Sequence, residues 1–428
     1  MGAAVTTLLT IAMIAKEATA VLHDKLALAK KATRRYEGEF GNKSSQIGNS
    51  VSIRKPAKYA VGTTADVSSL ASVTEEDFVT LTCDQRRNVL MNFTSLDLAL
   101  SIGEFRTQIL NPAISRLVRE VEIQGYKQLK TTPQIRYGRT VTGALTFLDY
   151  TKMNAILTTR LMPEEGRSLY ASAMDQADVV NANKGLFQDA TELSKQYRMG
   201  YMGMSGGFAW IGSENTQSIT WASAIPVAGT LTATAAQEAV VLAVTGMGSA
   251  AIVKAGTAYT VAGVYAIDPE TQEQLGYLYT FIAASDVTLN ASGVGNITTT
   301  TKMRTTAESI TKATISALPQ SGAAITPVEA GSVASKTGRL VYGIHDNSVA
   351  LATIELATPP ESGTSSYESF EGIGVRVWNF SNGLTDTIKT RIDIQFGWCV
   401  DLMPEGIVST VGIAVSYTHL TLPTNREV

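Results

Sequence analysis

The residues with the clearest potential for chemistry are a serine set among glycines and a distant histidine. The segment Gly203-Met204-Ser205-Gly206-Gly207 matches the Gly-x-Ser-x-Gly spacing of a nucleophile elbow, where a strand-to-helix turn exposes the serine for acyl transfer. However, residues 208–212 are typical of a strand or loop, and His345, the one plausible base downstream, has no obvious partner in the expected order. The spacing therefore favours a glycine-rich β-hairpin packed closely on another backbone, with an esterase built on Ser205 as an alternative.

Two further pairs of titratable residues could exchange protons. Neighbouring residues on a strand point to opposite faces, so we expect His345 and Asp346 to lie in a loop rather than act together. Glu164 and Glu165 follow a proline, which is typical of the solvated first turn of a helix. With only 3 histidines in the chain, the commonest general base and metal ligand is scarce. We therefore expect no catalytic residue, no cofactor and no metal site.

The composition excludes several classes of protein. Lys and Arg total 35 against 38 Asp and Glu, so a formal net charge of −3 supplies no strongly basic field to hold nucleic acid. Charged residues make up 17%, against about 25% in typical soluble domains, which indicates that some of the surface contacts other protein. Cys83 and Cys399 lie far apart with no CxxC partner, which excludes a disulfide scaffold and a cysteine zinc site. The apolar segment 5–15 is too short to span a bilayer, and no basic residue precedes it, so we expect neither a membrane span nor export.

Helical spacing of apolar residues predicts the elements around these residues. Residues 3–31 form an amphipathic pattern, either an arm that docks on a neighbouring subunit or a helix folded back on its own core. Residues 96–129 predict the longest helix, which kinks or restarts at Asn111-Pro112. Further helices are expected within 145–154 and 170–190, with a turn between them.

Residues 36–90 are polar and carry short β-like runs at 51–53, 78–81 and 89–93. A two-stranded excursion of this kind is marginal in water, so it should lie on something else. Its mixed charges form either a solvated face or complementary pairs with a neighbouring copy. The charged residues in or beside it are Arg34, Arg35, Arg54, Lys55, Lys58, Arg86 and Arg87, with Glu37, Glu39, Asp66, Glu75, Glu76, Asp77 and Asp84.

Residues 216–333 form a block of Thr, Ala, Val and Gly with little charge, and predict short strands at 240–244, 259–264, 278–283 and 287–289. About 120 residues suffice for an independent β-sandwich or barrel. Later strands are expected at 339–342, 349–356, 373–379 and 390–400. Because residues 131–215 hold too few strands to close a sheet and 334–414 supply them, we interpret the block as an insertion.

Several segments, taken in order, resemble the major capsid protein of tailed bacteriophages, in the coat-protein branch with an inserted β domain. Val51-Ser52-Ile53-Arg54-Lys55-Pro56 resembles the strand of the family's extended loop, and residues 105–117, with Asn111-Pro112-Ala113, resemble its spine helix. Thr159-Arg160-Leu161-Met162-Pro163 is similar to the turn before the axial-domain helix, and residues 200–216 to the strand leaving that domain.

The resemblance implies an α+β fold with an inserted all-β domain. One departure is that residues 218–236 of the insertion hold no charged side chain, where the branch has a charged loop that bridges capsomers; the nearest charged loop here is 268–273. The end of the chain resembles a translated sequencing adapter and should carry no function. The implied divisions are an N-terminal helical arm at 1–35, an extended loop at 36–95, a spine helix of the peripheral domain at 96–133, the first part of the axial domain at 134–215, the inserted β domain at 216–333, return strands at 334–414 and a non-native tail at 415–428.

The function that the resemblance implies is structural. Copies of the chain would form the pentamers and hexamers of an icosahedral capsid around double-stranded phage DNA, with sequence-independent DNA contacts. A scaffolding protein and a portal are the expected partners, and assembly would take place in the bacterial host cytoplasm. The candidate contacts between subunits are Arg34, Arg35, Arg54, Lys55, Lys58, Glu75, Glu76, Asp77, Arg86 and Arg87. A bacterial surface or adhesion protein is the alternative, favoured by the Thr-rich and Ala-rich block but opposed by the lack of an export signal.

Overall fold

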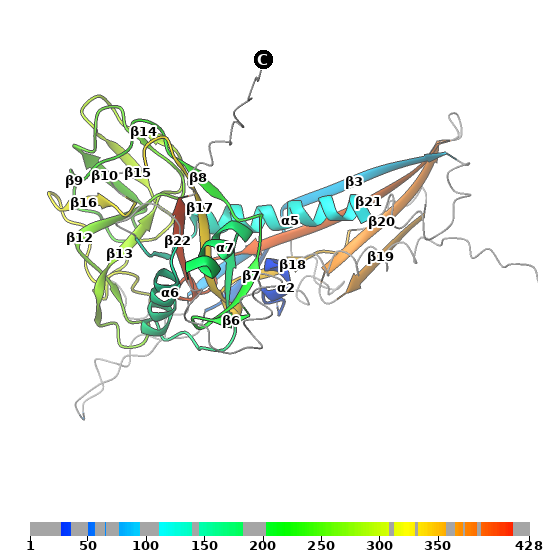
Figure 1. Cartoon of the computed structure of the whole chain (residues 1–428), viewed down its shortest axis with the longest axis horizontal. Coiled ribbons are helices and arrows are strands. Elements are labelled where there is room, and N and C mark those ends of the chain that lie inside the picture. The colour runs from blue at the N-terminus through cyan, green and yellow to red at the C-terminus, as the bar shows by residue number, and fades with distance from the viewer. Residues whose placement is uncertain are drawn as a thin grey trace, which may run out of the picture.

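A computed structural model describes residues 27–35, 50–55, 65, 77–94, 111–138, 145–182, 203–307, 312–329, 333–356, 364–370, 373–382 and 387–413. The molecule is drawn out: a wide β-rich end carries a long helix and several long strands that run away from it (Figure 1). Within these ranges, no helix is long and apolar enough to cross a membrane. Of the expected N-terminal helix, only its last turn, α2 (Leu28–Lys31), falls inside the described residues, and the tail at 415–428 lies outside them.

The long helix α5 (Asn111–Thr131) packs against the sheet that contains β21 (Thr387–Cys399), here called the long sheet. Buried apolar residues occupy every second position of β21 at Ile392, Ile394 and Phe396. They join Leu117 and Val121 of the helix in one apolar cluster. A strand that alternates in this way has one face for the core and one for other contacts. The sheet runs in the order β18 (Ala350–Thr353), β21 (Thr387–Cys399), β20 (Ile373–Asn382) and β19 (Thr364–Phe370), with β3 (Gln85–Thr94) also paired to β21.

A second sheet joins the chain on either side of the block at 216–333. Strands β5 (Arg167–Ala171) and β7 (Phe208–Gly212) come before this block. Strands β17 (Thr337–His345) and β22 (Ile407–Ile413) come after it, and β17 pairs with both β5 and β22. The later residues therefore supply the strands that the earlier ones lack. The order is β4 (Ile135–Arg136), β22 (Ile407–Ile413), β17 (Thr337–His345), β5 (Arg167–Ala171), β7 (Phe208–Gly212) and β6 (Met204–Ser205), with β8 (Ser218–Thr220) on β17.

Two helices accompany the second sheet, α6 (Phe147–Thr159) and α7 (Ala173–Ala182). A capping box starts α6, because the Thr146 backbone N–H donates to Asp149 Oδ2 over 2.8 Å. The structure differs from the expected helix at 170–190, since Tyr170 and Ala171 belong to strand β5. All five residues of β5 are buried, so this strand shows no alternation that would distinguish it from a buried helix.

The inserted block forms a sheet of its own, with its own core. Tyr259, Phe281 and Ile325 lie in an apolar cluster whose buried members come almost entirely from this block. Because β8 pairs with β17, the separate sheet begins only at Gly229. Its order is β13 (Gln274–Ile282), β12 (Ala258–Ile267), β16 (Ala324–Pro327), β9 (Gly229–Leu231), β10 (Val241–Thr245) and β15 (Gly295–Thr298), beside the pair β11 (Ile252–Val253) and β14 (Val287–Thr288).

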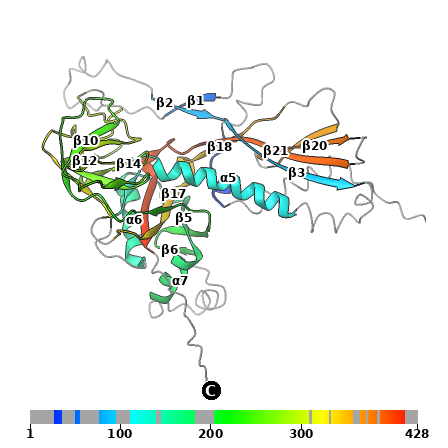
Figure 2. The same ribbon diagram turned by 90° about the horizontal axis from the view of Figure 1, so that it is seen from above.

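Within the polar excursion at 36–90, β1 (Ser50–Arg54) and β2 (Phe78–Thr82) pair as an antiparallel hairpin. Ile53, Val79 and Leu81 are buried on one face of it, in a cluster with the buried cysteines Cys83 and Cys399. Figure 2 shows the hairpin on one side of the body, between the inserted sheet and the long strands. The base of the excursion thus lies on its own chain, as a hairpin with little apolar content requires.

Candidate functional site

The serine of the elbow-like segment lies in a β-hairpin. Ser205 ends β6, Gly206 and Gly207 turn with φ of 62° and 81°, and β7 follows antiparallel instead of a helix. Strands β5 and β7 separate Ser205 on β6 from His345 on β17. A Cβ on Gly207 would lie 2.2 Å from Asn154 Nδ2 of α6, so the hairpin packs on a side chain rather than on another backbone. Among the described residues, the geometry provides neither the elbow nor the base that Ser205 would need.

The two other candidate pairs lie at the end of a strand and in a turn. His345 is still in strand β17 rather than in a loop, and its Nδ1 accepts the Asn347 N–H at 3.3 Å. Burial lowers the pKa of His345 below its ordinary value. Glu164 and Glu165 lie in an exposed turn between α6 and β5, not in the first turn of a helix. Over the described part of the chain, no group of three or more His, Cys, Asp or Glu could hold a metal ion.

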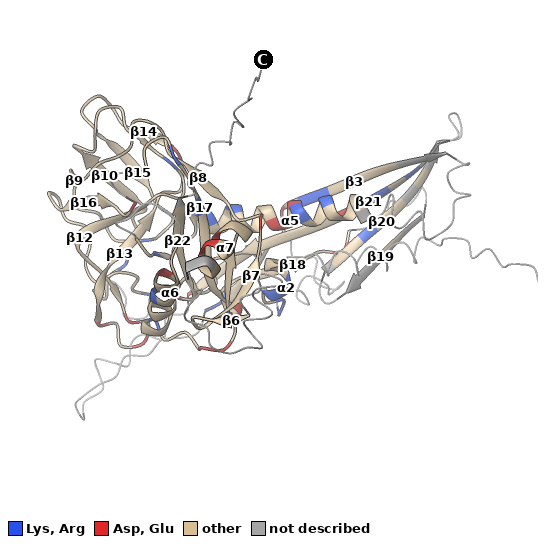
Figure 3. Ribbon diagram, in the orientation of Figure 1, with Lys and Arg blue, Asp and Glu red and all other residues tan. Residues whose placement is uncertain are grey.

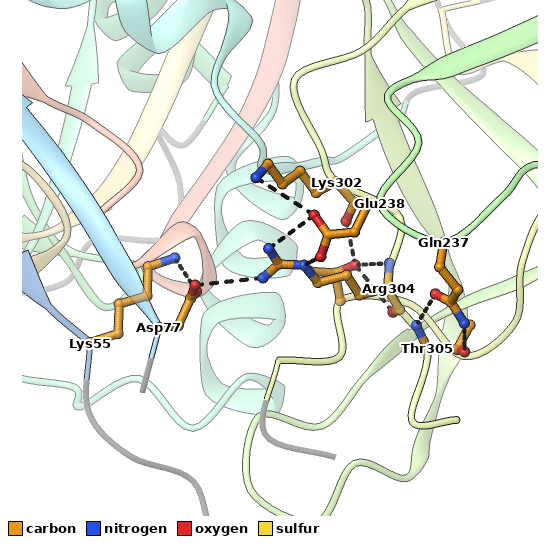
Figure 4. Close-up of polar contacts among 8 residues, drawn as sticks. Lys55, Asp77, Gln237, Glu238, Lys302, Arg304 and Thr305 are labelled. Carbon is orange, nitrogen blue, oxygen red and sulfur yellow. Dashed lines mark hydrogen bonds and ion pairs between the residues drawn. The ribbon is translucent and has the colours of Figure 1, made fainter. Parts of the chain in front are cut away.

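The base of the excursion contacts the inserted sheet region through charged side chains (Figure 4). Lys55 Nζ lies 3.4 Å from Asp77 Oδ2, and Arg304 Nη1 lies 3.5 Å from Asp77 Oδ1. Arg304 also donates from Nε and Nη2 to both carboxylate oxygens of Glu238, and Lys302 lies 3.6 Å from the same carboxylate. Hydrogen bonds from Arg304 hold the pKa of Glu238 below its ordinary value.

A second charged cluster lies on the long sheet, on the face of β21 opposite the α5 core. The Asp393 side chain is 0% exposed, and its carboxylate forms ion pairs with three arginines. The shortest nitrogen–oxygen distances are 2.5 Å to Arg376, 2.6 Å to Arg391 and 3.4 Å to Arg86. Three guanidinium groups against one carboxylate give these four side chains a positive formal charge in sum. Figure 3 shows Lys and Arg on α5 and along the long strands.

The other predicted contact residues that the structure describes have different contacts from the two charged clusters above. Arg34 Nη2 donates to the Ala29 carbonyl at 2.7 Å, at the end of α2, and Arg35 is exposed beside it. The guanidinium of Arg54 stacks 5.8 Å above the Phe78 ring. Arg87 donates to the Arg86 carbonyl at 2.8 Å on β3. Lys58, Glu75 and Glu76 lie outside the described residues, and contact of this whole set with a neighbouring copy stays a prediction.

A buried ion pair joins the inserted block to the second sheet, and sequence reasoning missed it. Arg136 Nη1 lies 2.8 Å from Glu329 Oε1, with side chains 0% and 8% exposed. The same guanidinium donates to Ser409 Oγ at 2.8 Å and to the Gly256 carbonyl at 3.0 Å. Burial raises the pKa of Glu329, although Arg136 opposes this effect. The available signal in the sequence was Arg136 itself, a charged residue directly after the apolar Ile135.

A buried carboxylate also ties the N-terminal segment to the long helix. Glu122 of α5 accepts the backbone N–H groups of Ala27 and Leu28, the latter at 2.8 Å, and the Asn215 side-chain amide at 3.0 Å. Burial raises the pKa of Glu122, while these hydrogen bonds lower it. The contact fixes α2 against α5 at the point where the N-terminal segment meets the body.

Several large apolar side chains stay exposed on the elements around the second sheet. Met204 on β6 is 75% exposed, and Leu148 on α6 and Met174 on α7 are each 59% exposed. All three lie on elements of one sheet region, where contact with another protein molecule would bury them.

Comparison with known proteins identifies the family. A family model described as P22 coat protein, gene protein 5, matches residues 3–412. Solved structures resemble the chain: one described as Mycobacterium phage Che8 at 12% identity (TM-score 0.44, 90% of each chain covered) and the capsid asymmetric unit of cyanophage A-1(L) at 11% (TM-score 0.42, 96% of each chain). The capsid of Ralstonia phage GP4 is 7% identical, with a TM-score of 0.45 over 90% of this chain and 88% of that one. At these identities and scores, the likenesses add nothing about function.

The family match decides between the expected functions. No curated protein sequence matches the chain. The match at 3–412 includes the inserted block, whose composition alone had favoured a surface or adhesion protein, and nothing supports that alternative. The α+β class with an inserted all-β sheet is confirmed by the strand order. The chain therefore belongs to the P22 coat protein family and is a major capsid protein, a structural subunit of the phage virion shell.

Proposed function

We propose that copies of this chain form the pentamers and hexamers of an icosahedral shell around double-stranded DNA, and that the chain catalyses no reaction. The observation that carries this proposal, beyond the family, is the exposure of three large apolar side chains, Leu148, Met174 and Met204, on elements of one sheet region. Apolar area of this kind is left in water by the isolated chain and is buried only when another molecule covers it. Neighbouring copies in a capsomer would supply that cover.

The charged residues of the excursion provide a second kind of contact in the proposal. The Asp393 cluster on the long sheet has a positive formal charge in sum, and the excursion holds an acidic run at Glu75-Glu76-Asp77. Opposite charges steer association and fix its register more than they add affinity. We place the acidic run of one copy against Arg86 and Arg391 of a neighbour, which are the more exposed arginines of the cluster, with 42% and 28% of their side chains exposed.

The remaining partners follow from the chemistry of packaging. A formal net charge of −3 gives the shell no strong attraction for DNA, so contacts with the genome would be few and independent of base sequence. A scaffolding protein would direct closure of the shell, and a portal would occupy one vertex. Assembly would take place in the bacterial host cytoplasm, which suits two buried cysteines that are not joined in a disulfide.

Expression of the full chain with a scaffolding protein, followed by sedimentation and electron microscopy, tests the proposal. Closed shells are expected, and a Leu148→Ser, Met204→Ser variant should give at least tenfold fewer of them. Its thermal unfolding as a monomer should be unchanged, since both side chains are already exposed. Ala155→Ser, at an exposed position on the same helix α6, is the matched control and should assemble normally. Monomers under every condition, or normal yield from the double variant, would refute the proposed role of these side chains.

A further inference from the structure

The two faces of the β1–β2 hairpin have different surroundings. One face is buried in an apolar cluster with Ala350 and Ala352 of β18. The hairpin also borders a cleft of about 440 Å³, which the inserted block and the body line as well. Phe78 lines this cleft and is 49% exposed. The hairpin is therefore packed tightly on one side and faces open space on the other.

Arg304 spans the edge of this cleft. Its guanidinium contacts Asp77 of the hairpin at 3.5 Å and forms two hydrogen bonds to Glu238 of the inserted block. The Arg304 side chain is 14% exposed and that of Asp77 is 30% exposed, so water reaches the hairpin half of the contact (Figure 4).

The two halves of this contact differ in how firmly they are held. On the inserted side, Gln237 Nε2 donates to Thr305 Oγ1 at 2.7 Å, and Thr305 N–H donates back to Gln237 Oε1 at 3.2 Å. The Glu238 N–H also donates to the Met303 carbonyl at 2.9 Å. These bonds fix Arg304 beside Glu238. The hairpin half is a longer, partly hydrated ion pair, which is the kind that is made and broken easily.

We propose that Arg304 is a releasable strap, which sets the angle of the β1–β2 hairpin by holding Asp77 against the inserted block. When the ion pair opens, Arg304 stays on Glu238 while the hairpin moves into the cleft. Residues 56–76 connect β1 to β2 in the sequence, so the angle of the hairpin sets where this segment starts and ends. This consequence for assembly rests on the proposed capsid function, but the strap itself is a property of the unassembled chain.

Amide hydrogen exchange of the unassembled full chain tests the strap. In Asp77→Asn, amides of residues 50–55 and 78–82 should exchange about threefold to fivefold faster, the loss expected for one partly exposed ion pair. Arg304→Gln should give the same change in the hairpin. In Asp77→Asn the amides of β10 and β12 should keep their wild-type rates, which shows that the inserted sheet is intact.

Lys302→Gln is the matched control, because Lys302 contacts Glu238 within the same cluster but not Asp77. Its hairpin amides should exchange at the wild-type rate. Raising the salt concentration should speed hairpin exchange in the wild type and not in Asp77→Asn, since screening weakens only an existing ion pair. Unchanged hairpin exchange in Asp77→Asn, or equal acceleration in Lys302→Gln, would overturn the strap. Neither result depends on shell formation, so failure of assembly alone would count against the proposed function instead.

Discussion

Replacing Arg136 by Met should loosen the junction between the inserted block and the second sheet. In this variant the Glu329 carboxylate loses its cationic partner. It stays buried, because only 8% of the Glu329 side chain is exposed. It also removes the donors to Ser409 Oγ and to the Gly256 carbonyl. Methionine fills much of the arginine volume, so the loss is mainly electrostatic rather than a cavity.

The expected cost follows from these contacts. Breaking a buried ion pair by removing one partner costs roughly 3–5 kcal/mol. Each lost hydrogen bond adds about 1 kcal/mol. Protonation limits the loss, because burial already raises the pKa of Glu329 and the unpaired carboxyl can take up a proton. We expect about 4 kcal/mol at neutral pH, a large share of the roughly 5–15 kcal/mol that stabilises a folded domain.

Urea unfolding of the full chain, followed by tryptophan fluorescence and circular dichroism, measures this loss. At an m value of about 3 kcal/mol per molar, the midpoint should fall by more than 1 M. Adding Glu329→Gln to Arg136→Met should recover about half of the loss, because no buried charge then lacks a partner. A midpoint for Arg136→Met equal to that of the wild type would refute the reasoning. A double variant as unstable as the single one would show that packing, not charge, matters at this junction.

Two further predictions concern the N-terminal contact and the glycine-rich hairpin. Burial raises the pKa of Glu122 above 4.5, so the folded chain holds this proton more tightly than the unfolded chain; its contribution to stability is full below about pH 4.5 and is lost as the pH rises through the raised pKa. Thermal unfolding from pH 4.5 to 8 should show this decline in the wild type and not in Glu122→Gln, and parallel profiles would contradict it. Gly207→Ala should cost about 2 kcal/mol or more, because φ is 81° and the new Cβ meets Asn154. Gly276→Ala has open space at the Cβ and should stay within about 0.5 kcal/mol of the wild type by urea unfolding, so similar losses in both would be inconsistent with strain at residue 207.

Much of the fold could be predicted because its patterns are local. Apolar residues at helical spacing predicted the long helix, whose described part is Asn111–Thr131. Short β-like runs between turn signals predicted β12 and β20, and the glycine-rich segment 203–207 predicted a β-hairpin, which the structure forms with positive φ at Gly206 and Gly207. Strand β5 could not be recognised in this way, because a fully buried strand has no polar alternation.

The charged contacts show the limit of sequence reasoning most clearly. Lys55, Asp77 and Arg86 were recognised as candidates for contacts, but their partners Arg304 and Asp393 were not. Any cation in the chain satisfies the rules for pairing with Asp77, and only the folded geometry brings one of them within reach. The same holds for Asp393, whose position between apolar residues of a strand gave no sign that three arginines would surround it.

The sequence by itself determined the insertion, because composition and strand signals are short-range properties of the chain, and the class of the fold followed from the resemblance of its ordered segments to a known family. Only the tertiary structure decided that the inserted block is joined to the body through Arg136 and Glu329 and to the excursion through Arg304 and Asp77. The physical reason is that an ion pair depends on the distance between two side chains in space. That distance is set by the packing of whole sheets rather than by residues near either partner in the sequence.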